Sequence, residues 1–155
     1  MTVRLYILSS ADYFRELMQL VKKETAKQKV VWITLSRPYT QLRDALDLSG
    51  IPANRVFFID GVTSLAAKKL ENIENCVFVE GPSDIMGITI AIGEILQLIP
   101  DKLTIILDSI SILRAYHNAD VVEQFTNYLL SKARQAGADA ALLVGDENTT
   151  QLGNI

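Results

Sequence analysis

The sequence contains few of the residues that metal, thiol and disulfide chemistry require. Its 155 residues include one cysteine, Cys76, and one histidine, His117. A single cysteine excludes an internal disulfide, and one histidine with one cysteine leaves a zinc site short of ligands. Cys76 precedes an apolar run and is expected to be a small core residue, with His117 in an exposed loop. A lone thiol is typical of a reducing compartment, so we expect a cytoplasmic protein.

The chain also lacks a basic surplus and a membrane-spanning run. Fifteen basic and 18 acidic residues give a net charge of −3, whereas proteins that bind nucleic acid usually carry excess positive charge. The most apolar stretch, residues 85–99, contains Glu94 and stops before Pro100. It is shorter than the roughly 20 residues that a membrane span needs, and the N-terminus has no signal-peptide core. We therefore expect a protein partner or a homo-oligomer, without nucleic acid or membrane.

Short apolar runs, each followed by a polar turn, are present along the whole chain. Hydrophobic residues make up 49% of the sequence, which suits a sheet covered on both faces. Runs rich in Val, Ile, Leu and Phe predict six strands, at residues 3–8, 30–35, 56–59, 76–79, 103–107 and 140–144.

Helical patterns separate these strands. Ser9 or Ser10 is expected to cap the first helix, and a second begins at Pro38 and ends near Gly50. Residues 62–74 predict a short helix and a loop. Further helices are expected at 85–98, capped by Ser83 or Asp84, and at 119–135, closed by Gly137.

Strands that alternate with helices predict an α/β fold in three layers, with a mostly parallel, doubly wound sheet. Residues 1–145 are expected to form one domain and residues 146–155 a polar tail. Ligands bind such sheets beyond the carboxyl ends of the strands. The candidate ligand-binding residues there are Ser9, Ser10, Ser36, Arg37, Asp108 and Ser109. Polar residues are also ordinary in such loops, so they locate a face without establishing an activity.

Two segments resemble the KaiC-like ATPases, in the RecA branch of the P-loop proteins. They are KVVWITLSRPYTQLRDALDLSGI, residues 29–51, and LTIILDSISILRAYHNADVVEQFTNYLLSKARQAGADAALLV, residues 103–144. The Asp-Ser-Ile-Ser sequence at 108–111 is similar to the end of the family's Walker B strand. The resemblance implies a RecA-like topology and an archaeal source, with Asp108 as the residue that would hold Mg²⁺. Because the sequence stops shortly after Val144, it also implies that later strands of the family core are missing.

The resemblance fails at the catalytic positions. A phosphate-binding loop needs glycines, a lysine and a hydroxyl, but the first strand is followed by SSADYFRELMQL, with bulky Tyr13 and Phe14. KaiC-like ATPases carry paired glutamates before the proline of the second segment, where this chain has Ser36 and Arg37 ahead of Pro38. Neither of these residues acts as a general base at neutral pH.

The leading expectation is a KaiC/RecA-like domain that has lost ATP hydrolysis and acts as a binding or regulatory module, with no cofactor. The alternative is a noncanonical Mg-ATP-binding hydrolase in which Asp108 holds Mg²⁺ and Arg37 contacts phosphate. If Asp108 does not hold a metal ion, we expect its carboxylate to cap the next turn or to form hydrogen bonds with the neighbouring backbone.

Two other nucleotide or phosphate sites are disfavoured. A receiver domain would use an acid such as Asp60 as the phosphate acceptor, but the required lysine is absent from LLVGDENTT at 142–150. A dinucleotide site would require a glycine fingerprint after the first strand, and SSADYF contains no glycine.

Overall fold

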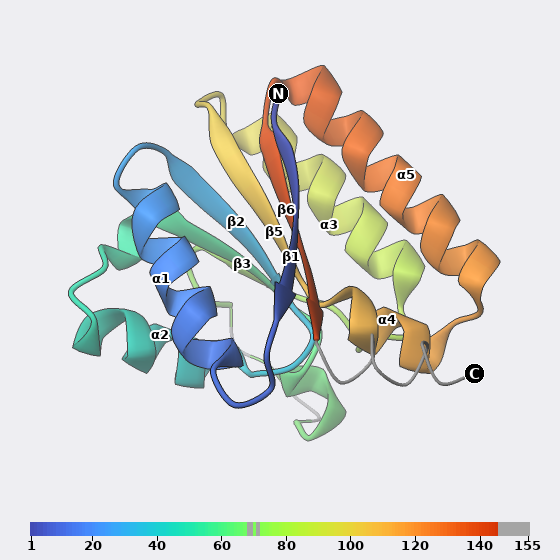
Figure 1. Ribbon diagram of the computed structural model, residues 1–155, viewed down its shortest axis with the longest axis horizontal. Helices are drawn as coiled ribbons and strands as arrows, with labels where there is room; N and C mark the ends of the chain where they lie inside the picture. The colour runs from blue at the N-terminus through green and yellow to red at the C-terminus, as the bar shows by residue number, and fades with distance from the viewer. Residues whose placement is uncertain (68–69, 71, 146–155) are drawn as a thin grey trace.

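A six-stranded, entirely parallel sheet forms the centre of the molecule (Figure 1). The computed structural model describes residues 1–67, 70 and 72–145. The strand order is β1-β6-β5-β2-β3-β4. The strands are β1 (Val3–Leu8), β2 (Lys29–Thr34), β3 (Val56–Asp60), β4 (Cys76–Phe78), β5 (Leu103–Asp108) and β6 (Asp139–Gly145). All six predicted strands are present, with ends that differ by one residue at most.

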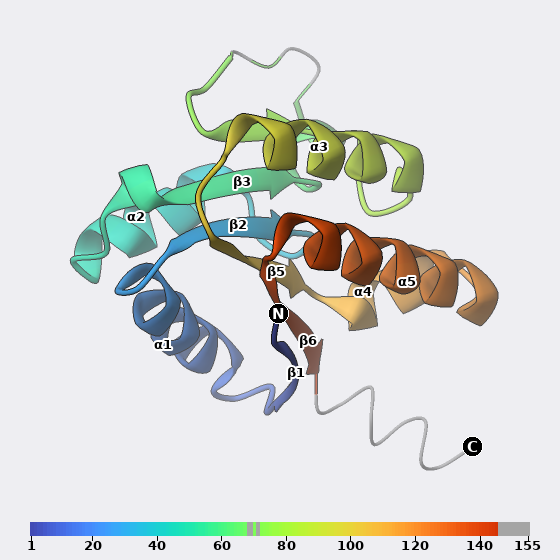
Figure 2. The same cartoon turned by 90° about the horizontal axis from the view of Figure 1, so that it is seen from above.

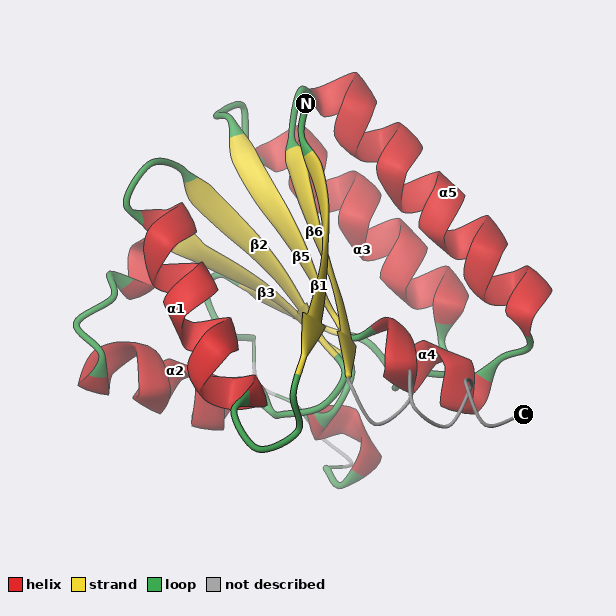
Figure 3. Cartoon of the chain, viewed as in Figure 1, coloured by secondary structure: helices red, strands yellow, loops and turns green. Residues whose placement is uncertain are grey.

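Helices cover both faces of this sheet (Figures 2 and 3). One face carries α1 (Tyr13–Thr25) and α2 (Tyr39–Leu48), and the other carries α3 (Ile85–Leu98), α4 (Ile110–Tyr116) and α5 (Ala119–Ala136). Single turns of 3₁₀ helix lie in the loops before and after β3, at Ala53–Arg55 and Thr63–Leu65. The expected three-layer, doubly wound α/β fold is confirmed.

The two cores lie on opposite faces of the central strands. On β2, Val31 and Ile33 pack with α3 and α5, whereas Val30 and Trp32 pack with α1 and α2. All six residues of β5 are buried, from Leu103 to Asp108. Such strands read as continuous apolar runs because both faces are covered, which explains why the sequence located them.

Three helix ends test the predicted caps. The cap expected from Ser9 or Ser10 is wrong: Asp12 precedes α1, and its side chain makes no capping hydrogen bond. Asp84 does cap α3, since its Oδ1 accepts from the Gly87 N–H at 2.9 Å. Gly137 closes α5 in the left-handed conformation, at φ 68°, as expected of a helix-terminating glycine.

The sequence did not predict α4, whose seven residues lie between the strand predicted at 103–107 and the helix predicted at 119–135. Ser109 caps this helix, with its Oγ accepting from the Ile112 N–H at 3.4 Å. The helix ends at His117, whose ring Nε2 lies 2.9 Å from the Pro82 carbonyl oxygen. His117 lies in the connection between α4 and α5, as expected of a loop residue, but it is half-buried, so the expected exposure is wrong. The predicted polar tail lies outside the described residues, as does part of the predicted loop at 62–74.

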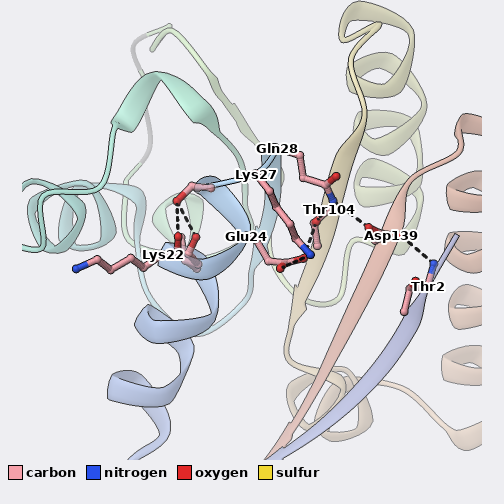
Figure 4. Close-up of polar contacts among 9 residues, drawn as sticks. Thr2, Lys22, Glu24, Lys27, Gln28, Thr104 and Asp139 are labelled. Carbon is pink, nitrogen blue, oxygen red and sulfur yellow. Dashed lines mark hydrogen bonds and ion pairs between the residues drawn. The ribbon is translucent and has the colours of Figure 1, made fainter.

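A polar network joins the C-terminal end of α1 to the amino ends of the strands (Figure 4). The buried Glu24 carboxylate accepts from the Thr104 hydroxyl at 2.9 Å and pairs with the Lys27 ammonium at 3.2 Å. Gln28 donates to Thr104 and to Asp139, 3.0 Å away in the second case. The network supplies partners for polar groups that would otherwise be buried alone, so its role is to hold α1 on the sheet.

Candidate functional site

Four of the six candidate residues end or follow β2 and β5, which lie side by side with β3: Ser36, Arg37, Asp108 and Ser109. In the sheet register Thr34, the last residue of β2, is level with Asp60 of β3 and with Asp108 of β5. The loops after these strands and the first turn of α1 meet at this carboxyl edge. The residues predicted from separate segments therefore share one region of the molecule, as the parallel topology requires.

Asp108 is enclosed by side chains from two other segments. Its exposed fraction is 0%. The Tyr13 hydroxyl, from the first turn of α1, donates to its Oδ1 at 2.6 Å. The Ser36 hydroxyl, from the loop after β2, donates to its Oδ2 at 3.2 Å. Both carboxylate oxygens thus have donors from within the chain.

The electrostatics of this carboxyl follow from its enclosure. Burial raises the pKa of Asp108 above its ordinary value, and the hydroxyls of Tyr13 and Ser36, the Trp32 indole and the Arg37 charge act in the opposite direction. Burial, and then the charge of Asp108, raise the pKa of Tyr13 as well. Tyr13 therefore keeps its proton at neutral pH and acts as a hydrogen-bond donor to the carboxylate.

Arg37 is held by contacts on its backbone and its side chain. The centre of its guanidinium lies 4.1 Å from the centroid of the Phe14 ring, in a cation–π arrangement. The Thr34 hydroxyl donates to the Arg37 carbonyl oxygen at 2.7 Å, and its Oγ1 accepts from the Arg37 N–H at 3.3 Å. The aromatic residue at position 14 thus provides the surface on which Arg37 stacks.

The remaining candidate serines have local roles. Ser109 is buried and caps α4, so its hydroxyl oxygen is directed at the helix start. Ser9 accepts the Asp12 N–H at 3.3 Å through its carbonyl oxygen, which forms the turn before α1, and Ser10 is exposed. The structure therefore joins Ser36 to Asp108 directly, and Arg37 acts on Asp108 through its charge.

Asp60 is a second buried carboxylate at this edge, and its hydrogen bonds are saturated. Its Oδ1 accepts from the N–H groups of Val62 and Thr63, at 2.7 and 2.9 Å. Its Oδ2 accepts from the Tyr39 N–H at 2.9 Å and from the Thr63 hydroxyl. With four donors and no exposed surface, Asp60 joins the end of β3 to α2 and leaves no free oxygen for phosphorylation.

Other chemistry finds little support in the described part of the chain. Burial raises the pKa of Cys76 to about 12, so its thiol is protonated and unreactive at neutral pH. No group of three or more His, Cys, Asp or Glu side chains is placed to hold a metal ion among the described residues. Within the same residues, no helix combines the length and the apolar character that crossing a membrane requires.

Sequence reasoning identified Tyr13 and Phe14 only as residues too bulky for a phosphate-binding loop. The structure gives them positive roles, as the donor to Asp108 and as the stacking surface for Arg37. One signal was available: both residues begin a helix that directly follows a parallel strand, so they had to lie at the carboxyl edge. Their contact partners were not predictable, because 95 residues separate Tyr13 from Asp108.

Comparison with known proteins gives a likeness of fold. No family model matches the chain, and no curated protein matches it. A solved structure of KaiC-like protein PH0186 from Pyrococcus horikoshii OT3 matches with a TM-score of 0.60 at 17% identity, over 93% of this chain. Uncharacterized protein PH0321 from Pyrococcus horikoshii, solved in complex with an unknown peptide, matches with a TM-score of 0.64 at 13% identity, also over 93%.

The chain spans 62% of the PH0186 chain and 68% of the PH0321 chain. At these identities the likeness establishes the fold, and the resemblance to KaiC-like domains is confirmed at that level.

Proposed function

We propose that this chain is a noncatalytic binding module on a KaiC/RecA-like fold, which takes a protein or peptide partner and does not use ATP. The observation that carries the proposal is the closed carboxylate of Asp108, the one residue that matches the catalytic equipment of KaiC-like ATPases. It is 0% exposed and accepts hydrogen bonds from Tyr13 and Ser36.

A magnesium ion would need this carboxylate to be accessible and ionised. Mg²⁺ keeps an octahedral shell that includes several water molecules, and a site without exposed surface has no room for them. Binding would have to displace the Tyr13 hydroxyl, which lies 2.6 Å from Oδ1. The burial that raises the pKa of Asp108 also opposes the charged form that a metal requires.

The phosphate groups of a nucleotide would meet a second obstacle. The turn from β1 into α1 contains no glycine and no lysine, so the backbone cradle and the cation of a phosphate-binding loop are both missing. Arg37 is the nearest substitute cation, but it stacks on Phe14 at 4.1 Å. One face of the guanidinium is covered by this ring, so a phosphate could meet only its in-plane N–H groups, and moving Arg37 off the ring would cost about 0.5–2 kcal/mol.

The class of partner is supported by a neighbour in structure. PH0321, which shares the fold, was solved with a peptide bound. A chain of this fold without a usable nucleotide site retains its surface loops and sheet edges, and sheet edges bind extended peptides by strand addition. We therefore propose a protein or peptide as the ligand, in place of a nucleotide.

Thermal unfolding with and without millimolar Mg²⁺ and ATP, ADP or GTP tests the loss of nucleotide binding. A ligand present at 100 times its dissociation constant stabilises a protein by about 2.7 kcal/mol. For a domain of this size, that raises the unfolding midpoint by about 5–11 °C. We expect no nucleotide-specific shift. A shift that disappears in Asp108→Asn and in Arg37→Ala would contradict the proposal and favour a Mg-nucleotide enzyme.

A further inference from the structure

Strand β1 forms one edge of the sheet (Figure 2). It pairs with β6 on one side, and no strand of the described residues pairs with its other side. Natural proteins usually protect such edges with prolines, charged residues or bulges, because an open edge is a template for another strand. Over its six residues β1 has no proline and a single charge, Arg4.

The side chains of β1 leave an apolar row uncovered. Val3, Leu5 and Ile7 are 42%, 60% and 57% exposed. They are level with Ala140, Leu142 and Val144 of β6 and lie on the same face of the sheet. Ala140 and Leu142 are buried in the core beneath α5. The helical cover therefore ends over β6, and the apolar surface continues past it.

The free backbone groups belong to the same three residues. The Ala140 N–H donates to the Thr2 carbonyl oxygen at 2.9 Å. Because alternate residues of a strand bond to a given neighbour, the even-numbered residues of β1 face β6. The N–H and C=O groups of Val3, Leu5 and Ile7 consequently point away from β6, toward the open edge. Each of these residues presents an apolar side chain and two hydrogen-bonding groups together.

We propose that β1 pairs antiparallel with β1 of a second copy of this chain, with the twofold axis at Leu5, to form one continuous sheet across two molecules. Only residues with outward-pointing groups exchange hydrogen bonds. Centring the pair on Leu5 joins each Val3 to Ile7 of the other copy and each Leu5 to its equivalent. The three residues of each strand whose backbone groups point toward the edge are then all paired. Their side chains lie on one face of the sheet and form one apolar cluster.

The charge on the strand fits this arrangement. In the same register Arg4 lies opposite Tyr6 of the second copy, so the two Arg4 side chains are diagonal to each other and not directly opposed. Like charges placed directly opposite destabilise a strand pair, whereas a cation beside an aromatic ring is tolerated. The strand is thus complementary to itself, and this is the reason for assigning a second copy as the partner. The inference does not depend on the proposed binding function.

Such an interface is small. Stable interfaces bury about 1,200–2,000 Å² in total, and one pair of short strands lies toward the lower end of the known range. We therefore expect a weak dimer whose population rises with protein concentration. Sedimentation velocity from micromolar to millimolar chain should show this rise. Leu5→Lys should remove it, whereas Leu48→Lys, at a 90% exposed position on α2, should leave it unchanged.

Cysteine cross-linking tests the register. In a Cys76→Ala background, Leu5→Cys should form a disulfide-linked dimer under mild oxidation. The Cα atoms of a hydrogen-bonded antiparallel pair lie about 5.5 Å apart, within the range that a disulfide spans. Val3→Cys alone and Ile7→Cys alone should link poorly, because neither faces its own equivalent. A mixture of these two variants should link efficiently, and Leu48→Cys measures random collision.

Three results would overturn the proposal. The first is a chain that stays monomeric at every concentration. The second is Leu5→Cys linking no faster than Leu48→Cys. The third is Val3→Cys linking to itself as well as Leu5→Cys does, which would indicate a parallel pair. Hydrogen exchange provides a further test. The amides of Val3, Leu5 and Ile7 should become more protected as the protein concentration rises. Protection that is already present in the monomer would mean that the chain covers this edge itself, and would also contradict the proposal.

Discussion

Removing one hydroxyl tests how tightly the carboxyl edge is closed. Tyr13→Phe deletes the donor to Asp108 and leaves the ring in place. Ser36, 3.2 Å from Oδ2, would remain as the hydrogen-bond donor to the buried carboxylate. The substitution creates almost no cavity, so the measured change in stability reports on this hydrogen bond.

The expected cost is set by the charge of the acceptor. Hydrogen bonds to charged groups contribute about 1.5–3 kcal/mol, and the 2.6 Å separation is typical of a charge-assisted bond. We expect Tyr13→Phe to lose about 2 kcal/mol of unfolding free energy, or about 4–8 °C in the midpoint. Tyr128→Phe is the matched control, because the Tyr128 hydroxyl donates to the neutral Thr89 carbonyl at 3.2 Å. Its loss should be about 1 kcal/mol or less.

The loss in Tyr13→Phe should also depend on pH. The hydroxyl opposes the rise in the pKa of Asp108, so its removal raises that pKa further. An acid whose pKa is higher in the folded state than in the unfolded chain loses stability as pH rises, from the unfolded value of about 3.9 up to the folded value. The deficit of Tyr13→Phe should therefore grow with pH between the folded-state pKa of Asp108 in the natural chain and its higher folded-state pKa in the variant. Urea unfolding at several pH values measures it, and a deficit equal to that of Tyr128→Phe at every pH would refute the reasoning.

Four further substitutions have defined outcomes. Asp108→Asn removes the buried charge and keeps the shape, so it should match or exceed the natural chain in stability at neutral pH and flatten the pH dependence of urea unfolding; a loss above about 2 kcal/mol would contradict this. Asp60→Ala leaves three backbone N–H groups unpaired and should cost at least about 3 kcal/mol by chemical denaturation, and a near-neutral result would mean that water replaces the carboxylate. Gly87→Ala should destabilise by about 1 kcal/mol or more in thermal unfolding, because an added Cβ would overlap the Asp84 carboxylate that caps α3. Gly93→Ala, whose nearest neighbouring atom would lie 4.0 Å away, should gain about 0.5–1 kcal/mol, and equal effects at the two glycines would exclude the cap as the cause.

The sheet was predictable from the sequence because strands that are buried on both faces appear as continuous runs of apolar residues. β2 and β5 are apolar along almost their whole length, and turn residues mark their ends. The helix α4 was missed for the opposite reason. Its seven residues are too few to establish a helical period, and a single residue, Ser109, separates it from the end of β5.

The candidate site was predictable in position but not in detail. Asp108 and Ser36 end neighbouring parallel strands, so their meeting followed from the predicted topology. The roles of Tyr13 and Phe14 depend on how α1 packs across the strand ends, which local sequence does not encode. The missing glycines predict that a phosphate-binding loop is absent, and in the structure the bulky residues at these positions contact Asp108 and Arg37.

The most direct test of the closed carboxyl edge uses a paramagnetic metal. Mn²⁺ replaces Mg²⁺ at nucleotide sites and broadens the NMR signals of nearby amides. We would titrate ¹⁵N-labelled chain with Mn²⁺ in the presence of ATP and follow the amides of Ser36, Arg37 and Asp108. The account predicts that these signals broaden no more than those of exposed acidic residues elsewhere, such as Asp101 and Glu123. Selective broadening at Asp108 and Ser36, saturating with added Mn²⁺ and ATP, would show an open metal–nucleotide site and contradict the account.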